Sequence, residues 1–271
     1  MTAPTGEAAG VPVALVTGAA RGIGAAVALR LARAGWNLVL VDAGADDPAL
    51  AYPLASPAEL EAVVAACGED RAVGVLGDVR DQAALDGAVA LALDRFGGLD
   101  AAVAGAGAVA GGPNLWEGSD QLFEAMVGIN LEGVWRTARA AVPALLARPE
   151  PRRGRFVAVA SAGGTMGLPR LAAYSAAKHG VIGLVRSLAA ELGPFGVTAN
   201  AVAPGSTDTA MLAASAAVYG LEDPGEFARH HLQPRLLDPD EVAALVAWLC
   251  GPESSGVTGA VLPVDAGMTA G

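Results

Sequence analysis

A tyrosine and a lysine, Tyr174 and Lys178, lie four residues apart in a stretch with helical spacing of apolar residues, Ala172–Leu192. Positions four apart share one helix face, so the phenol and the ammonium can point into one pocket. A free tyrosine is a poor base at neutral pH, and a nearby ammonium favours its phenolate and lowers its pKa. The spacing therefore predicts an acid/base tyrosine, although taken alone the pattern is more typical of an exposed helix face.

Two further polar residues strengthen the case for a reacting site. Ser161 ends the β-branched run Phe156–Ala160, which places a hydroxyl at the carboxyl end of a predicted strand. Asn130 lies in the apolar helical stretch Met126–Trp135, where a buried amide is costly unless it bonds something specific. The alternative for Asn130 is a hydrogen bond that bends its helix or joins two helices.

A glycine-rich turn, Thr17–Gly24, follows a predicted strand and opens a predicted helix. Its glycines permit a sharp bend, close approach of the backbone to a pyrophosphate, and tight helix–strand packing. Exposed N–H groups and the helix dipole favour a phosphate there. A flexible loop is the alternative. The residues predicted to contact a dinucleotide here are Gly18, Arg21, Gly22, Ile23 and Gly24.

Acidic residues end the next two predicted strands. Asp42 comes 18 residues after Gly24, close to the separation expected for an acid that binds ribose hydroxyls. Its carboxylate would repel a 2′-phosphate, so the cofactor is expected to be NAD; a solvated strand-end acid is the alternative. Asp78 and Val79 are expected to contact adenine. For Asp78, the N-cap of the helix beginning near Asp81 is an almost equal alternative.

Short β-branched runs alternate with longer Ala- and Leu-rich stretches, which predicts a doubly wound α/β fold with a seven-stranded parallel sheet. Residues 11–271 are expected to form a single Rossmann domain and residues 1–10 a flexible tail. The predicted strands are Val13–Val16, Asn37–Val41, Val73–Leu76, Ala101–Ala104, Phe156–Ala160, Thr198–Val202 and Val261–Val264. The predicted helices are Ile23–Ala34, Pro57–Cys67, Asp81–Phe96, Asp120–Leu146, Ala172–Leu192 and Pro239–Cys250. Two shorter helical patterns lie at Ala210–Tyr219 and Pro224–His231.

Composition excludes several classes of protein. The chain has 271 residues, of which 53% are hydrophobic and 17% charged, so it can bury a core. A net charge of −11 disfavours nucleic acid and anionic membrane surfaces as partners. Two cysteines, no Lys or Arg in the first ten residues and no long apolar run indicate a cytoplasmic protein. No Cys/His spacing is typical of a metal site.

Taken together, these motifs resemble the short-chain dehydrogenase/reductase family over essentially the whole chain from Val11. The resemblance implies a nicotinamide cofactor, hydride transfer at an alcohol or ketone, and a homotetramer. The segments that carry it are Thr17–Gly24, the set Asn130, Ser161, Tyr174 and Lys178, the run Asn200–Gly205, and Thr258-Gly259 with Val264-Asp265.

The resemblance also implies a role for each residue of the site. Tyr174 would be the catalytic acid/base, Lys178 would bond the nicotinamide ribose, Ser161 would hold the substrate oxygen, and Asn130 would anchor a proton-relaying water. The carboxamide end of the cofactor would meet Pro204, Gly205, Thr207 and Thr209.

One motif departs from the family. Its Asn-Asn-Ala-Gly is Ala104–Gly107 here, which leaves strand-stabilising hydrogen bonds to other groups and puts the adenosine side in doubt. Gly105 is still expected beside the cofactor.

A narrower resemblance, to the mycofactocin-coupled branch, comes from Asp46–Pro57 and Leu146–Gly154. It implies NAD that stays bound and is reoxidised by a peptide-derived carrier, mycofactocin. Physically, Tyr52, Pro53 and Leu54 could fold over the cofactor; the alternative is a surface loop.

The long stretch 206–237 is expected to close over a small apolar alcohol or ketone, because it carries Met211, Leu212, Val218, Tyr219 and Phe227. Two other functions stay open. One is a freely exchanging NAD-linked reductase of the 3-oxoacyl type. The other is a non-catalytic nucleotide-sensing Rossmann protein, against which the intact Tyr174/Lys178 pair argues.

Overall fold

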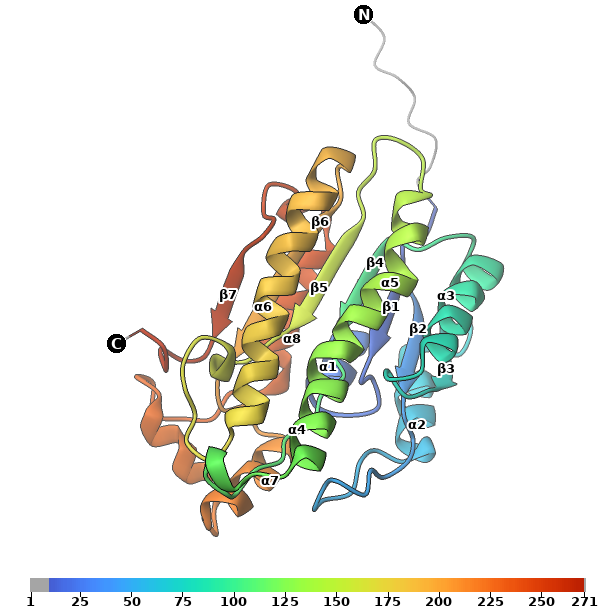
Figure 1. Ribbon diagram of the computed structural model, residues 1–271. Helices are drawn as coiled ribbons and strands as arrows, with labels where there is room; N and C mark the ends of the chain where they lie inside the picture. The colour runs from blue at the N-terminus through green and yellow to red at the C-terminus, as the bar shows by residue number, and fades with distance from the viewer. Residues whose placement is uncertain (1–9, 271) are drawn as a thin grey trace, which may run out of the picture.

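Seven strands form one parallel sheet in the computed structural model, which describes residues 10–270 (Figure 1). Their order across the sheet is β3-β2-β1-β4-β5-β6-β7, as in a Rossmann-like α/β domain. Most are buried on both faces, which explains their rows of Val, Leu and Ala. The strands are β1 (Val13–Thr17), β2 (Asn37–Asp42), β3 (Ala72–Leu76), β4 (Ala101–Ala104), β5 (Arg155–Val159), β6 (Thr198–Pro204) and β7 (Val261–Val264).

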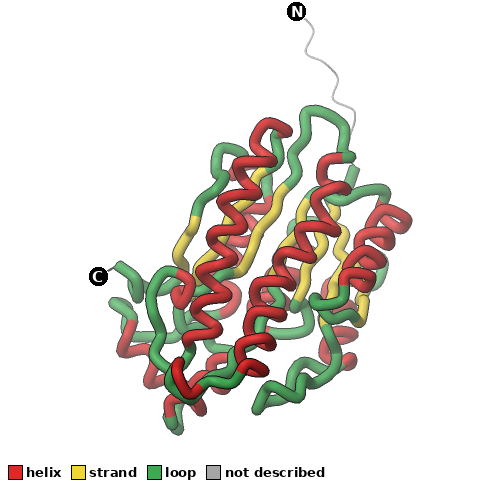
Figure 2. Tube along the Cα trace, in the orientation of Figure 1, coloured by secondary structure: helices red, strands yellow, loops and turns green. Residues whose placement is uncertain are grey.

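Helices cover both faces of the sheet (Figures 1 and 2). Their small Ala side chains let them approach the strands closely, and two apolar clusters fill the space on either side. One face packs against α3 (Gln82–Phe96), α5 (Gly133–Leu146) and α6 (Ala172–Leu192), and the other against α1 (Gly22–Arg33), α2 (Pro57–Cys67) and α8 (Pro239–Cys250).

The sheet positions the site through its topology. The chain runs outward from β1 to β2 and β3, then crosses back to place β4 on the other side of β1. At such a switch point the connections leave in opposite directions, so a crevice opens beyond the carboxyl ends of the strands. Two short helices, α4 (Asp120–Val127) and α7 (Ala210–Tyr219), lie at that end in Figure 1.

Two predicted helices differ from the structure. The single helix expected over Asp120–Leu146 is α4, a π-helical turn at Gly128–Glu132, and α5. The spacing of apolar residues cannot reveal the wider π-helical turn, because on either side of it apolar residues still recur every three or four positions, as in an α-helix. The helical pattern at Pro224–His231 is a 3₁₀ helix over Pro224–His230.

The expected tail at residues 1–10 lies outside the described residues except for Gly10. Within residues 10–270, every helix is too short or too polar to cross a lipid bilayer.

Candidate active site

A cavity of about 660 Å³ lies at the carboxyl ends of the strands, along the switch point between β1 and β4. It joins segments that are far apart in the sequence. Every residue predicted as catalytic or cofactor-binding lines this cavity except Asn130, which lies behind its wall. The lining includes Gly18, Arg21, Gly22, Ile23, Gly24, Asp42, Asp78, Val79, Gly105, Ser161, Tyr174, Lys178, Pro204, Gly205, Thr207 and Thr209. Of the residues expected to cover the cofactor or the substrate, Pro53 and Val218 lie outside the lining.

The glycine turn forms a cradle that side chains would fill. Gly18 and Gly22 have φ of +69° and +58°, in the left-handed region that favours glycine. A Cβ on Gly24 would lie 1.9 Å from the carbonyl oxygen of Gly18. The turn therefore leaves backbone N–H groups and the start of α1 free to face an anionic group such as a pyrophosphate.

The segment Ala104–Gly107 is held by the hydroxyl of Thr17. Its Oγ1 accepts hydrogen bonds from the backbone N–H groups of Gly105, at 3.2 Å, and Ala106, at 3.3 Å. A Cβ on Gly105 would lie 2.8 Å from the carbonyl oxygen of Thr17, so β1 and the segment after β4 touch through backbone. A threonine on β1 thus helps to keep this wall of the cavity in place.

Asp42 ends β2 with one carboxylate oxygen engaged. Its Oδ2 accepts a hydrogen bond from the N–H of Ala20, at 2.9 Å, which fixes the carboxylate beside the glycine turn. The nearby cation on the turn, Arg21, donates to the carbonyl oxygen of Pro53 at 2.8 Å. The second oxygen of Asp42 is placed to accept from a hydroxyl in the cavity.

Asp78 lines the cavity but is not an N-cap. Asp81 caps α3 instead, accepting from Ala83 N at 2.9 Å. The carboxylate of Asp78 is held by Arg80, whose Nη2 lies 2.5 Å from Oδ2. Although burial acts to raise the pKa of Asp78, hydrogen bonds and charge from Arg80 outweigh it, so the pKa lies below its ordinary value.

Tyr174, Lys178 and Ser161 meet at the carboxyl end of β5. The ammonium of Lys178 donates to the carbonyl oxygen of Val159 at 2.9 Å and lies 5.7 Å from the centre of the Tyr174 ring. Burial lowers the pKa of Lys178 to about 8. Burial also raises the pKa of Tyr174, and the Ser161 hydroxyl beside it opposes that rise. The predicted lowering of the Tyr174 pKa by Lys178 is therefore wrong for the protein by itself, because desolvation dominates.

Asn130 lies in the π-helical turn and is fully buried. Its Nδ2 donates to the carbonyl oxygens of Ala108, at 2.9 Å, and Met126, at 3.0 Å. Its Oδ1 accepts from Ala108 N at 3.3 Å. These bonds join the turn to the segment after β4. They are close to the alternative given for Asn130 above, a hydrogen bond that bends its helix or joins two helices. They also fix the part of the wall where Gly107 faces Lys178.

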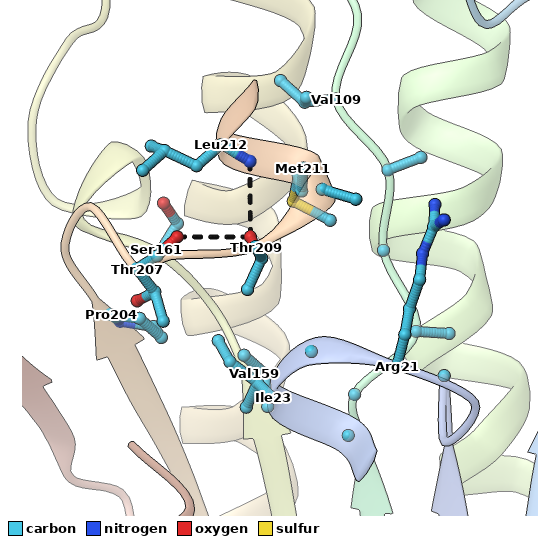
Figure 3. A pocket seen from close by; sticks show the side chains of 18 of the residues that line it. Arg21, Ile23, Val109, Val159, Ser161, Pro204, Thr207, Thr209, Met211 and Leu212 are labelled. Carbon is cyan, nitrogen blue, oxygen red and sulfur yellow. Dashed lines mark hydrogen bonds between the residues drawn. The ribbon is translucent and has the colours of Figure 1, made fainter. Parts of the chain in front are cut away.

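The loop after β6 forms the wall opposite the glycine turn. Figure 3 shows Thr207 and Thr209 near Ser161, with Arg21 on the far side. The hydroxyl of Thr209 donates to the carbonyl oxygen of Thr207 at 3.2 Å and accepts from Leu212 N at 3.3 Å, capping α7. These contacts tie the loop to α7, which carries Met211 and Leu212 over the cavity (Figure 3).

Residues 43–56, here called the strap, fold against the cavity. The hydroxyl of Tyr52 accepts from Val109 N at 3.1 Å, and the carboxylate of Asp47 lies 2.7 Å from Nη1 of Arg80. Tyr52, Leu54 and Ala55 line the cavity directly. The strap is thus anchored against the cavity by Tyr52 and Asp47, whereas Pro53 is exposed and lies outside the lining.

Sequence reasoning missed several contributors to the cavity, among them Val109, Leu168 and Leu171 as well as Arg80 and Met268. Arg80 joins the strap to Asp78, and its place directly after Asp78-Val79 is a signal that could have been used. Met268 reaches the lining from the C-terminal segment, and nothing in its local sequence indicates this.

A Rossmann sheet with a glycine cradle, a strand-end acid and a buried tyrosine–lysine pair defines a dinucleotide-dependent oxidoreductase. A family model described as enoyl-(acyl carrier protein) reductase matches residues 18–269. An uncharacterised NAD-dependent oxidoreductase of Mycobacterium tuberculosis is 40% identical over 263 residues, 94% of each chain. (−)-trans-Carveol dehydrogenase of Rhodococcus erythropolis is 37% identical over 272 residues, 95% of this chain and 97% of that one.

A solved structure agrees with these relatives. Carveol dehydrogenase from Mycobacterium avium, in complex with NAD, matches with a TM-score of 0.90 and 37% identity, covering 98% of this chain and 100% of that chain. The chain belongs to the short-chain dehydrogenase/reductase family. The predictions of an oxidoreductase and of NAD as its cofactor are confirmed at this level.

We expect Asn130→Ala to lower the free energy of unfolding by about 2 kcal/mol, because it strands buried backbone groups of Ala108. Gln121→Ala removes an exposed amide side chain on α4 and is expected to change it by less than about 0.5 kcal/mol. Urea unfolding measures both. Equal stabilities of the two variants would contradict the bracing role of Asn130.

Proposed function

We propose that this protein catalyses the reversible, NAD-linked oxidation of a small apolar secondary alcohol to its ketone. The observation that carries the proposal is the meeting of Tyr174, Lys178 and Ser161 in one cavity with the glycine turn and Asp42. A cavity that joins a proton-transferring group to a dinucleotide cradle is the arrangement that hydride-transfer chemistry requires.

The donor set of the cavity fits NAD. The glycine turn would hold the pyrophosphate, and the free oxygen of Asp42 would accept from the adenosine ribose. Gly105 would lie along the nucleotide, Asp78 and Val79 would face the adenine, and the loop Pro204–Thr209 would hold the carboxamide end. When bound, NAD accepts or returns the hydride.

Proton transfer falls to Tyr174. In alcohol oxidation its phenolate takes the hydroxyl proton, and in ketone reduction its phenol returns one. Ser161 is placed to hold the substrate oxygen beside the phenol, since its hydroxyl already lies close enough to oppose the rise that burial causes in the pKa of Tyr174. Lys178 would bond the nicotinamide ribose, and Asn130 would support a water that passes the proton to solvent.

The substrate end of the cavity is apolar. Its wall is built from Val109, Leu168, Leu171, Met211, Leu212, Tyr219 and Phe227. An uncharged hydrocarbon skeleton gains most from such a wall, because burying apolar surface stabilises the complex while a charged group would lose its hydration. A cyclic monoterpenol of the carveol type has this character, and the names of the relatives support it.

The strap supports a further part of the proposal, retention of NAD. Three contacts hold it down: Tyr52 to Val109 N, Arg21 to the carbonyl oxygen of Pro53, and Asp47 to Arg80. A cofactor beneath the strap leaves only when these contacts break. We therefore infer that NAD stays bound and is reoxidised in place by an external peptide-derived carrier, mycofactocin. The cytoplasm as location and a homotetramer as assembly remain predictions from sequence.

Tyr174→Phe is expected to reduce turnover about 1,000-fold while leaving NAD affinity unchanged, because only the proton donor is lost. Ser175→Ala, next to it and outside the cavity lining, should behave like the wild type. Because burial raises the pKa of Tyr174, kcat/KM for alcohol oxidation should climb as pH rises from about 7 to about 10. A flat profile, or an active Tyr174→Phe across a panel of alcohols, contradicts the proposed role.

Asp42→Ser is expected to weaken NAD binding about tenfold and to strengthen NADP binding, because it removes the ribose acceptor and the repulsion of a 2′-phosphate. Asp94→Ser, on an exposed face of α3, makes the same change in net charge and should alter neither affinity. Titration with both nucleotides measures the effect. An unchanged preference for NAD would place the ribose elsewhere.

Purified wild-type protein is expected to carry NAD, and Asp47→Ala to lose it about tenfold faster, because the buried carboxylate of Asp47, which is itself outside the cavity lining, no longer ties the strap to Arg80. Asp70→Ala, an exposed change of equal charge, is the control. Nucleotide content after gel filtration and exchange with labelled NAD measure retention. Protein that carries no nucleotide and turns over added NAD freely would favour the 3-oxoacyl type of reductase.

A further inference from the structure

One of the three histidines is buried. His231 is 5% exposed, whereas His179 and His230 are exposed. His231 follows the 3₁₀ helix Pro224–His230 and does not line the cavity. The proposed reaction does not use His231, so the reason for burying this polar side chain lies in its hydrogen bonds.

Its hydrogen bonds fix which ring nitrogen carries the proton. Nε2 accepts from the backbone N–H of Ser206 at 3.1 Å, so this nitrogen is unprotonated. Nδ1 lies 2.7 Å from the carbonyl oxygen of Arg235, which only accepts, so the proton is on Nδ1. Both partners are satisfied by the neutral imidazole alone.

Ser206 belongs to the loop that faces the nicotinamide end of the cavity, and residues 231–237 brace that loop. The N–H of Leu237 donates to the carbonyl oxygen of Ser206 at 3.0 Å, and the N–H of Asp208 donates to that of Leu237 at 2.9 Å. Thr207 and Leu237 form a parallel bridge. His231 supplies the side-chain bond of this brace, directly before Thr207.

We propose that His231 is a positioning residue that holds Ser206 and Thr207 in place at the nicotinamide end of the cofactor site. The inference rests on the proposed function, in which Thr207 and Thr209 grip the carboxamide. For this role the side chain at position 231 must accept a hydrogen bond from Ser206 N, and an imidazole can do so only when it is uncharged.

Protonation would undo the contact. An imidazolium has N–H groups on both nitrogens, so Nε2 would face the N–H of Ser206 donor to donor. The charged side chains on the surrounding elements are engaged elsewhere or exposed, so they offer no ion pair to His231. Arg229 pairs with Glu226, and Arg235 pairs with Glu241. The Asp265 carboxylate accepts from residues 267 and 269, the Asp238 carboxylate accepts from the N–H of Asp240, and Asp208 and His230 are exposed.

The test measures how fast bound NADH leaves when excess NAD is added, at pH values from about 7.5 to about 5.5, since a lower pH favours the imidazolium. For the wild type we expect release about tenfold faster at the acid end, from loss of one buried hydrogen bond. His231→Gln supplies an acceptor that does not titrate and should give slow, pH-independent release. His231→Leu supplies none and should release NADH rapidly at every pH.

His230→Gln and His179→Gln are matched controls and should follow the wild type at each pH. Thermal unfolding shows which variants are folded. Acid-accelerated release that persists in His231→Gln, or wild-type release in a folded His231→Leu, overturns the inference. If His231→Leu does not fold, the comparison of His231→Gln with the wild type decides alone. A wild type that binds no NADH at any pH contradicts the proposed function, and the inference with it.

Discussion

The site depends on the burial of a phenol and an amine side by side at the carboxyl end of β5. Desolvation raises the pKa of Tyr174 and lowers that of Lys178, so each group is pushed toward its neutral form. A single backbone carbonyl, that of Val159, fixes the ammonium. Burial by itself therefore disfavours the phenolate that alcohol oxidation needs. In the proposed function, a cationic nicotinamide beside the phenol would favour that phenolate, which would connect proton transfer to the presence of the oxidised cofactor.

Keeping this pair in place requires rigid walls, and each wall is fixed by one polar side chain that bonds backbone. Asn130 ties the π-helical turn to Ala108, Thr17 ties β1 to Gly105 and Ala106, and His231 ties Ser206 to the segment behind it. In all three cases the partners are peptide groups, so each bond locks the path of the chain and not merely the direction of a side chain. The polar groups that touch a substrate need such fixed supports to hold their geometry.

The sequence predicted the sheet well, because buried parallel strands are continuous apolar runs and their ends carry Asp42, Asp78 and Ser161. Four helices, among them Pro57–Cys67 and Ala172–Leu192, have the predicted bounds because Pro and apolar spacing mark them. The π-helical turn could not be predicted, since it changes backbone bonding without changing the apolar pattern. Nor could the contact between Thr17 and the segment after β4 be predicted, because it joins residues 88 positions apart. The direction of the Tyr174 pKa shift failed for a similar reason: the spacing to Lys178 is local, whereas burial is a property of the whole fold.

The strap and the segment 231–237 lie outside the reacting centre, yet both bear on how long a cofactor stays. Tyr52 and Arg21 hold the strap against the cavity, and the segment 231–237 supports the loop after β6. Release of a dinucleotide needs only one of these walls to open. A protein that retains its cofactor must therefore stabilise both, and the wall with weaker support sets the rate of exchange. The strap is held by an ion pair, a hydrogen bond from the Arg21 guanidinium and one neutral hydrogen bond, whereas the loop after β6 relies on neutral hydrogen bonds, one of them to the imidazole of His231. Protonation of that imidazole would remove its bond to Ser206 N and leave the contacts of the strap unchanged. The proposed role of His231 therefore makes the wall behind Thr207 the one whose support depends on a proton.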